Sequence, residues 1–188
     1  MSATRINQKI SKTDEYMTPQ GAIDSIMPEI WTSAITSFLE PCAGSGNIVK
    51  AFNQLVSPKK CQSDWCEIAD GRDFFDSFKI LLPEYDLIIT NPPFSDAALF
   101  IDTCTGFSNC VIMLLRLNYF GSKGRKEWWQ TRLPTHLFTL SERPSFLDRK
   151  GSRVLNKDGK PGTDACEYAW FCWDKTGLVK RPHGMYVL

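Results

Sequence analysis

The clearest chemistry in the sequence lies in four consecutive residues, Asn91, Pro92, Pro93 and Phe94. They follow the apolar run 87–89, and the two prolines stiffen the segment and remove backbone donors. The side-chain oxygen of Asn91 and the carbonyl of Pro92 can then accept both protons of one planar NH₂ group. This withdraws the nitrogen lone pair from conjugation and makes it nucleophilic, while Phe94 stacks on the ring that carries the amine. We therefore predict activation of an aromatic amine, with a rigid turn as the alternative interpretation.

A second constellation, EPCAGSG at residues 40–46, combines a carboxylate with two closely spaced glycines. The segment is predicted to leave a strand and enter a helix, and ligands of open α/β sheets bind beyond the carboxyl ends of the strands. Gly44 and Gly46 allow a ligand to approach the backbone closely. Glu40 favours a cationic or amine-bearing ligand over a pyrophosphate, and no GK[ST] follows. A simple tight turn would have the same glycines.

Two acidic positions further along suit a ligand that contains a nucleoside. Glu67 lies about 20 residues after the glycines, at the end of the next predicted strand, where a carboxylate can accept from both hydroxyls of a ribose. Asp64 is the alternative for this role. Asp73 and Phe74 come next, and together they can accept from an exocyclic amine and stack on a purine. Packing of Phe74 in the core is an equally good interpretation.

The order of four blocks resembles the S-adenosylmethionine-dependent amino-methyltransferases, specifically the DNA N6-adenine class. The blocks are EYMTP at 15–19, EPCAGSGN at 40–47, DF at 73–74 and NPPF at 91–94. The later run, from MLLRLNYFGSKGRKEWW through LSERPSF to EYAWFCW, is similar to small phage-type adenine methyltransferases. The resemblance covers most of the chain, and the pairing of NPPF with E-P-x-x-G-x-G is its most specific part. It implies a Rossmann-like methyltransferase fold, S-adenosylmethionine as cofactor and DNA as partner.

The resemblance also implies roles for individual positions. The block that closes over the methionine end of the cofactor matches Tyr16, Thr18 and Pro19. The loop around its amino-acid and sugar portions matches Glu40, Cys42, Gly44 and Gly46. The ribose ligand matches Glu67, and the adenine pocket of the cofactor matches Asp73 and Phe74. The catalytic loop matches Asn91, Pro92, Pro93 and Phe94. Only five residues separate Glu67 from Asp73, where the family usually has a full helix, so Asp64 and Glu67 both stay open.

Charge is distributed unevenly along the chain. Residues 1–115 contain 8 Lys+Arg and 14 Asp+Glu, a net charge of −6, and residues 116–188 contain 14 and 7, a net charge of +7. A basic half of this kind favours a polyanionic partner, although a solvated face would look the same. The candidate phosphate contacts are Arg116, Lys123, Arg125, Lys126, Arg132, Arg149, Lys150 and Arg153. Trp128 and Trp129 lie among them and are expected either to stack on bases or to pack in the core.

These residues are positioned by alternating strand and helix patterns. Strands are predicted at 37–40, 61–67, 73–75, 87–89, 110–117, 136–140 and 167–173. Helices are predicted at 19–38, with Pro28 kinking or ending the first, and at 46–55 and 95–106. EWWQTR is expected to begin a helix or a structured loop. The pattern indicates an α/β domain with a largely parallel seven-stranded sheet flanked by helices.

Length and composition limit the possible classes. The 188 residues suit one domain, 1–188, in which 1–14 form a polar arm. A separate recognition domain does not fit, so 121–130 and 145–165 are the candidate substrate-recognition loops. Mean hydropathy is −0.24, and neither a membrane-spanning run nor a secretory signal is present. Seven cysteines without CxxC spacing and two histidines argue against structural zinc and for reduced thiols in the cytoplasm.

The leading hypothesis is therefore transfer of a methyl group from S-adenosylmethionine to the N6 of a flipped adenine in DNA, by direct in-line attack and without a metal. Methylation of RNA adenine or of a protein glutamine is the first alternative, because NPP[FY] serves those substrates as well. A catalytically idle relative that only binds nucleic acid is the second. The sequence does not indicate an oligomeric state.

Overall fold

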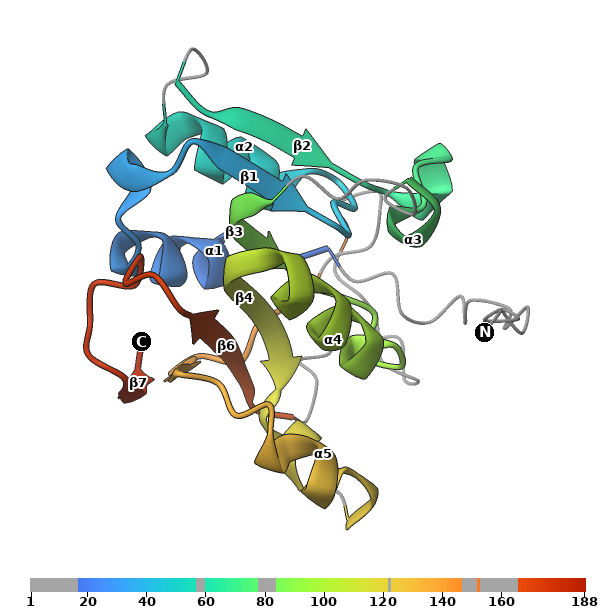
Figure 1. Cartoon of the computed structure of the whole chain (residues 1–188), viewed down its shortest axis with the longest axis vertical. Helices are drawn as coiled ribbons and strands as arrows, with labels where there is room; N and C mark the ends of the chain where they lie inside the picture. The colour runs from blue at the N-terminus through green and yellow to red at the C-terminus, as the bar shows by residue number, and fades with distance from the viewer. Residues whose placement is uncertain (1–16, 57–59, 78–83, 122, 147–151, 153–165) are drawn as a thin grey trace.

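A sheet of seven strands forms the centre of the molecule in the computed structural model (Figure 1). The structure describes residues 17–56, 60–77, 84–121, 123–146, 152 and 166–188. The strands are β1 (Ser37–Glu40), β2 (Gln62–Trp65), β3 (Tyr85–Thr90), β4 (Ser108–Arg116), β5 (His136–Thr139), β6 (Tyr168–Asp174) and β7 (Gly184–Val187). Their order is β2-β1-β3-β4-β6-β5-β7, and only β6 runs antiparallel to its neighbours. The predicted α/β fold with a largely parallel seven-stranded sheet is confirmed.

Helices cover both faces of this sheet. They are α1 (Gln20–Ile26), α2 (Asn47–Leu55), α3 (Phe74–Ser77), α4 (Ala97–Phe107) and α5 (Lys126–Gln130). The helices α1 and α2 pack on one face with alternate strand residues such as Phe38, Leu87 and Ile112. The helix α4, which crosses in front of β3 and β4 in Figure 1, packs on the other face with Ile88 and Val111. Because both faces are covered, β3, β4 and β6 are continuous apolar runs.

The seventh strand is not the one that the sequence predicts. Residues 73–75 were expected to be a strand, but Phe74 begins the helix α3. The carboxylate of Asp73 accepts from the backbone N–H of Phe75 at 2.8 Å, so the segment is capped as a helix. The missing strand is β7 at the other edge, where it pairs in parallel with β5. A four-residue run near the end of the chain gave too little pattern to predict it.

Most other element predictions are confirmed. The helix that begins at Gln20 ends at Ile26, and Pro28 lies in the short 3₁₀ turn that follows, as expected for a proline in a helical pattern. Lys123–Arg125 form another 3₁₀ turn before α5, so the candidate loop 121–130 is largely helical. The arm 1–14 and nearly all of the loop 145–165 lie outside the described residues. No helix among the described residues is both long and apolar enough to cross a membrane.

Candidate active site

Three parallel strands have their carboxyl ends side by side, and these ends form what is called here the carboxyl edge of the sheet. Glu40 ends β1, Thr90 ends β3 and Arg116 ends β4. The strand β3 pairs with both β1 and β4, so the glycine segment after β1 and the proline segment after β3 leave the sheet next to each other. The two constellations that carry the predicted chemistry therefore meet at the carboxyl edge, where ligands of open α/β sheets bind.

Glu40 is a fully buried carboxyl group at this edge. Its Oε1 accepts from the backbone N–H of Cys42 at 3.0 Å, whereas Oε2 is buried without a hydrogen-bond partner among the described residues. Burial raises the pKa of Glu40 to about 8, because the charged form loses its hydration. The Thr90 hydroxyl lies close enough to lower this pKa, although the two groups do not meet the geometry of a hydrogen bond. A cationic donor bound beside Glu40 would favour its ionised form, which then accepts hydrogen bonds.

The turn after Glu40 depends on two glycines. Gly44 and Gly46 have φ angles of 54° and 77°, the left-handed region that glycine adopts readily. The N–H of Gly44 donates to the Glu67 carboxylate at 2.7 Å, and the N–H of Ala43 donates to the Cys66 carbonyl at 2.8 Å. The end of β2 thus holds the turn in place.

The structure separates the two candidates for the ribose ligand. Glu67 lies against the glycine turn, and its other oxygen accepts from the Ala69 N–H at 3.0 Å. Asp64 lies within β2, where one oxygen accepts from Gln62 at 2.6 Å and from the Tyr85 hydroxyl at 2.8 Å. Because Asp64 is bonded to the body of the sheet, Glu67 is the carboxylate that adjoins the turn.

The N-terminal block also reaches this turn. The carbonyl of Thr18 accepts from the Asn47 side chain at 3.0 Å, and Pro19 precedes α1 directly. The thioether of Met17 accepts from the N–H of Ser45 at 2.9 Å and would clash with a side chain at Gly44. Tyr16, the remaining predicted residue of this block, lies outside the described residues. No sequence pattern indicates the contact of Met17, since its partner Ser45 lies 28 residues further along the chain.

The proline segment is partly buried, and its phenylalanine packs against the ring of Tyr168. Pro92 is buried, Pro93 and Asn91 are half-buried, and the Oδ1 atom of Asn91 is enclosed. The ring of Phe94 lies 5.8 Å from that of Tyr168, between centroids, so it is anchored from the start of β6. The pattern of β6 as a buried strand did not indicate that its first residue reaches the site.

Arg116 belongs to this aromatic group. Its guanidinium lies 4.7 Å from the centre of the Phe94 ring, and its Nε donates to the Tyr168 hydroxyl at 3.1 Å. Arg116 makes this cation–π contact because it ends the strand next to β3. The phosphate contact predicted for Arg116 stays a prediction.

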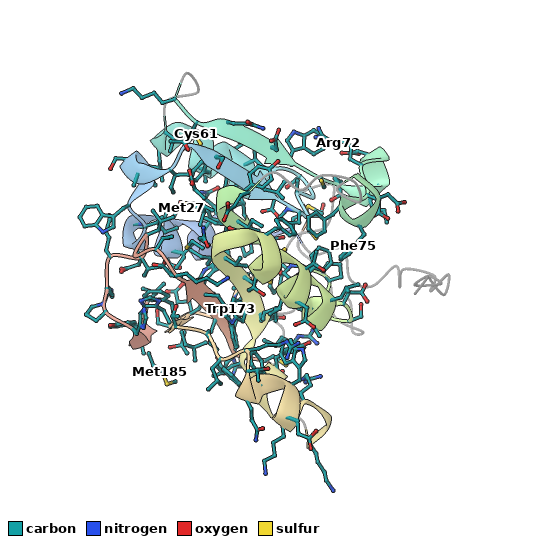
Figure 2. All side chains as sticks on the ribbon, in the orientation of Figure 1. Met27, Cys61, Arg72, Phe75, Trp173 and Met185 are labelled. Atoms are coloured by element: carbon teal, nitrogen blue, oxygen red, sulfur yellow. The ribbon has the colours of Figure 1, made fainter. Side chains whose placement is uncertain are left out.

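In the structure, the two residues predicted to bind a purine, Asp73 and Phe74, are a helix cap and a core residue. Phe74 is buried in the core, where its ring stacks on Phe100 with 5.6 Å between centroids. This is the core-packing alternative, since a buried ring leaves no face for a purine. Phe75, the next residue, is half-buried. Figure 2 shows Phe75 and Arg72 on the same side of the molecule. Asp73 caps α3, so its carboxylate has a structural task.

The basic residues differ in how far they are available to a partner. Lys123 and Lys126 are exposed at the end of the molecule formed by α5, which projects from the sheet in Figure 1. Arg125 donates to the Tyr119 carbonyl at 3.0 Å and lies 4.0 Å over the Tyr119 ring. Arg149, Lys150 and Arg153 lie outside the described residues. The lysines are the predicted phosphate contacts that the structure leaves at the surface.

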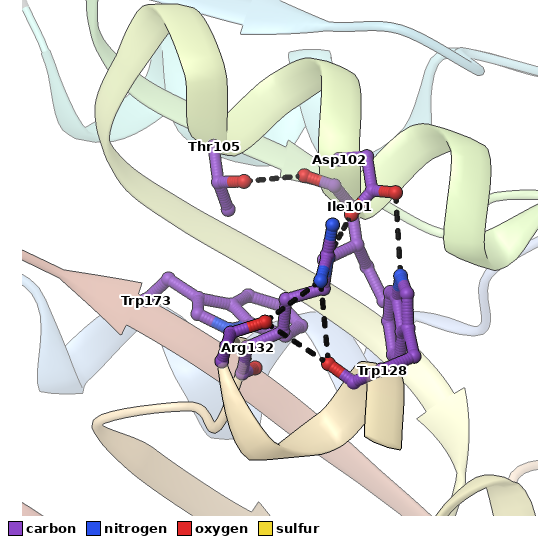
Figure 3. Close-up of polar contacts among 7 residues, drawn as sticks. Ile101, Asp102, Thr105, Trp128, Arg132 and Trp173 are labelled. Atoms are coloured by element: carbon purple, nitrogen blue, oxygen red, sulfur yellow. Dashed lines mark hydrogen bonds and ion pairs between the residues drawn. The ribbon is translucent and has the colours of Figure 1, made fainter. Parts of the chain in front are cut away.

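Arg132 is neutralised within the molecule (Figure 3). Its Nε forms an ion pair with Asp102 on α4, and the same carboxylate accepts from the indole N–H of Trp128 at 3.2 Å. The guanidinium also lies 5.2 Å from the centre of the Trp128 ring. Trp129 is buried, which is the core-packing alternative for this residue. The group joins α5 to α4, and the phosphate contact predicted for Arg132 stays a prediction.

Several solved structures have folds similar to that of this chain. A Listeria monocytogenes protein assigned to the class I S-adenosylmethionine-dependent methyltransferases aligns over 94% of this chain and 66% of its own, with 13% identity and a TM-score of 0.59. A Pyrococcus horikoshii protein assigned as an RNA methyltransferase aligns over 86% of both chains, with 14% identity and a TM-score of 0.60. The chain has the class I methyltransferase fold.

A third similar structure is the methyltransferase subunit of a type I restriction-modification system from Streptococcus thermophilus. It aligns over 88% of this chain and 46% of its own, with 12% identity and a TM-score of 0.55. The chain thus spans just under two thirds of the Listeria protein and less than half of the Streptococcus protein. No protein-family model matches the sequence. No curated protein sequence matches it either.

Proposed function

We propose that this protein transfers a methyl group from S-adenosylmethionine to the exocyclic N6 of adenine in DNA. The observation that carries the proposal is the position of the Asn91–Phe94 segment, which leaves the sheet beside Glu40 and the glycine turn. An amine acceptor site and a site for a cationic ligand thus adjoin at one edge. The class I methyltransferase fold supports the same reaction type, since the similar structures include proteins assigned to methyl transfer.

The residues at this edge fit S-adenosylmethionine. When bound, this cofactor supplies a methyl group on a sulfonium, which is already activated for transfer. The buried Oε2 of Glu40 lacks a hydrogen-bond partner among the described residues, which a cationic amine would provide, and Gly46 adds no side chain to the turn beside it. Glu67 is the carboxylate beside the turn, and a carboxylate accepts hydrogen bonds from hydroxyl groups. Thr18, Pro19 and Cys42 complete the proposed cofactor contacts, and Tyr16 and Asp73 stay predictions.

The chain's own residues then bind and orient the adenine. Asn91 Oδ1 and the Pro92 carbonyl accept the two protons of the amine, which directs the nitrogen lone pair towards the cofactor side. Phe94, held by Tyr168, offers an aromatic face for the base. An adenine in a duplex must leave the base stack to reach this position, at a cost of a few kcal/mol. Stacking and hydrogen bonding in the pocket would offset this cost.

RNA is the second candidate substrate. The similar structure from Pyrococcus horikoshii is assigned as an RNA methyltransferase and aligns over most of both chains. An unpaired adenine in an RNA loop would need no extrusion from a duplex, so it suits the same amine site.

Methyl transfer from radiolabelled S-adenosylmethionine tests the proposal directly. The purified protein is incubated in parallel with DNA, RNA and ribosomal protein, and the modified base is identified in digests by mass spectrometry. We expect label in DNA as N6-methyladenine. Label in RNA or in protein alone would replace the proposed substrate, and the absence of cofactor binding in calorimetry would refute methyl transfer altogether.

The surface lysines give a prediction about DNA binding. We expect the double change Lys123→Ala and Lys126→Ala to weaken binding evenly across sequences and to reduce the slope of log affinity against log salt concentration by about 2, roughly 1 for each lost phosphate contact. The slope is measured by fluorescence anisotropy with a labelled duplex. Arg132→Ala is the control: it should keep the slope but lower the melting temperature, because it breaks the contacts with Asp102 and Trp128. An equal loss of slope in both variants would contradict the assignment.

A further inference from the structure

A pocket of about 460 Å³ lies beside the proposed catalytic segment. It is lined by Leu117, Asn118, Gly121, Cys166 and Glu167. The first three residues follow β4 and the last two precede β6, so the pocket opens at the same edge of the sheet as the candidate active site. The N–H of Leu117 donates to the Glu167 carbonyl at 2.8 Å, which joins its two walls. The pocket is an open surface depression, because Asn118, Gly121 and Glu167 are exposed and Leu117 and Cys166 are half-buried.

One pair of side chains adjoins both the pocket lining and the proposed catalytic segment. Arg116 and Tyr168 adjoin the two walls of the pocket in sequence, are paired across β4 and β6, and are hydrogen-bonded to each other. Both contact the ring of Phe94. A nucleic-acid strand that delivers one base to Phe94 therefore brings an adjacent nucleotide over this pocket.

The lining favours a base and disfavours a phosphate. None of the five lining residues is basic, and Glu167 contributes a carboxylate. The Arg143 guanidinium donates to this carboxylate at 3.0 Å and lowers the pKa of Glu167, so the group is ionised and accepts hydrogen bonds only. Asn118 adds an amide that both donates and accepts, while Leu117 and Gly121 offer an apolar surface for the face of a ring.

We propose that this pocket binds the nucleobase next to the target adenine and that Asn118 and Glu167 select a base with an exocyclic amine. The inference rests on the proposed function and extends it to sequence preference. Glu167 accepts from the exocyclic amine, and the Asn118 amide pairs with the adjacent ring nitrogen. A base with a carbonyl in place of the amine would direct an oxygen at the carboxylate and be rejected.

Matched base analogues test this preference. Oligonucleotides with one target adenine carry cytosine or uracil, and adenine or purine, at each flanking position, and kcat/KM for methyl transfer is measured. Both pairs keep the ring size. Purine lacks only the amine of adenine, whereas uracil has a carbonyl in place of the cytosine amine and an N3–H donor in place of the N3 acceptor. At one flanking position we expect the amine-bearing base to be preferred by about tenfold or more, the range of a specific base contact. Glu167→Gln and Asn118→Ala should each reduce this ratio to within about threefold of unity.

Two control variants separate recognition from folding. Arg143→Ala breaks the ion pair but leaves the carboxylate in the pocket, so the preference should persist. Glu84→Gln changes a similar pair, Glu84 with Asn109 at 3.0 Å, which lies at the amino ends of β3 and β4, away from the pocket. This variant should leave the ratio unchanged. Equal rates for all flanking bases, or an unchanged ratio in Glu167→Gln, would overturn the inference while the proposed function stands. Failure to methylate any nucleic acid would refute both.

Discussion

Asn91→Ala is expected to lower kcat for methyl transfer by at least about 10²-fold, with little change in the affinity for S-adenosylmethionine. The Oδ1 atom of Asn91 is enclosed at the end of β3, where a hydrogen bond is stronger than in water. It is proposed to accept one of the two amine protons, and removal of one preorganised hydrogen-bonding group from a reacting centre costs about 10²–10³ in kcat. Single-turnover methyl transfer measures the chemical step, and calorimetry measures cofactor binding.

Asn91→Asp separates the acceptor from the shape of the side chain. Aspartate has the same size and keeps an oxygen in place, so this variant should retain more activity than Asn91→Ala at a pH at which its carboxylate is ionised. Circular dichroism checks that both variants are folded. A kcat of Asn91→Ala within about threefold of the unchanged protein would mean that methyl transfer does not use this side chain, and the proposed role of the segment would be wrong.

The parts of the fold that the sequence predicts are those decided by local pattern. The strands β3, β4 and β6 are buried on both faces, so each is a run of apolar residues that needs no knowledge of its neighbours. The proximity of Glu40 to Asn91 also follows from sequence, because parallel strands end at one edge. The strand predicted at 73–75 is wrong, because the Asp73 carboxylate caps the segment and Phe74 begins the helix α3.

The contacts of individual charged residues could not be predicted in this way. Arg132 looks like a phosphate ligand in the sequence, but its partner Asp102 lies 30 residues away on another element. Arg116 likewise contacts Phe94 only because β4 is adjacent to β3. Such pairing depends on tertiary placement, so a count of basic residues does not show which of them are paired within the protein. Lys123 and Lys126 lie exposed on the projecting end, and their phosphate contacts stay a prediction.

Glu40→Gln is expected to make the free protein more stable at alkaline pH. The folded protein holds the Glu40 proton up to a pKa of about 8, whereas the ordinary pKa of a glutamic acid, as in the unfolded chain, is 4.5. Between these values the folded state binds more protons than the unfolded state, so the free energy of unfolding falls as pH rises, by about 1.4 kcal/mol per pH unit for this group. Glutamine has no proton to lose, and the variant should lack this decline. Denaturant unfolding at pH 6 to 9 measures the difference between the two proteins.

The same substitution should weaken binding of S-adenosylmethionine, because a cationic ligand favours the ionised form of Glu40 that the free protein disfavours. Cofactor affinity of the unchanged protein should therefore rise with pH up to about 8, and that of Glu40→Gln should stay low and flat. Thr90→Val provides the directional control: its hydroxyl lowers the pKa of Glu40, so its removal should shift both pH dependences to higher pH. If the stability difference between Glu40→Gln and the unchanged protein does not vary with pH, Glu40 is ionised in the free protein. Binding of the cofactor would then displace no proton from Glu40, and the expected pH dependence of the affinity would be wrong.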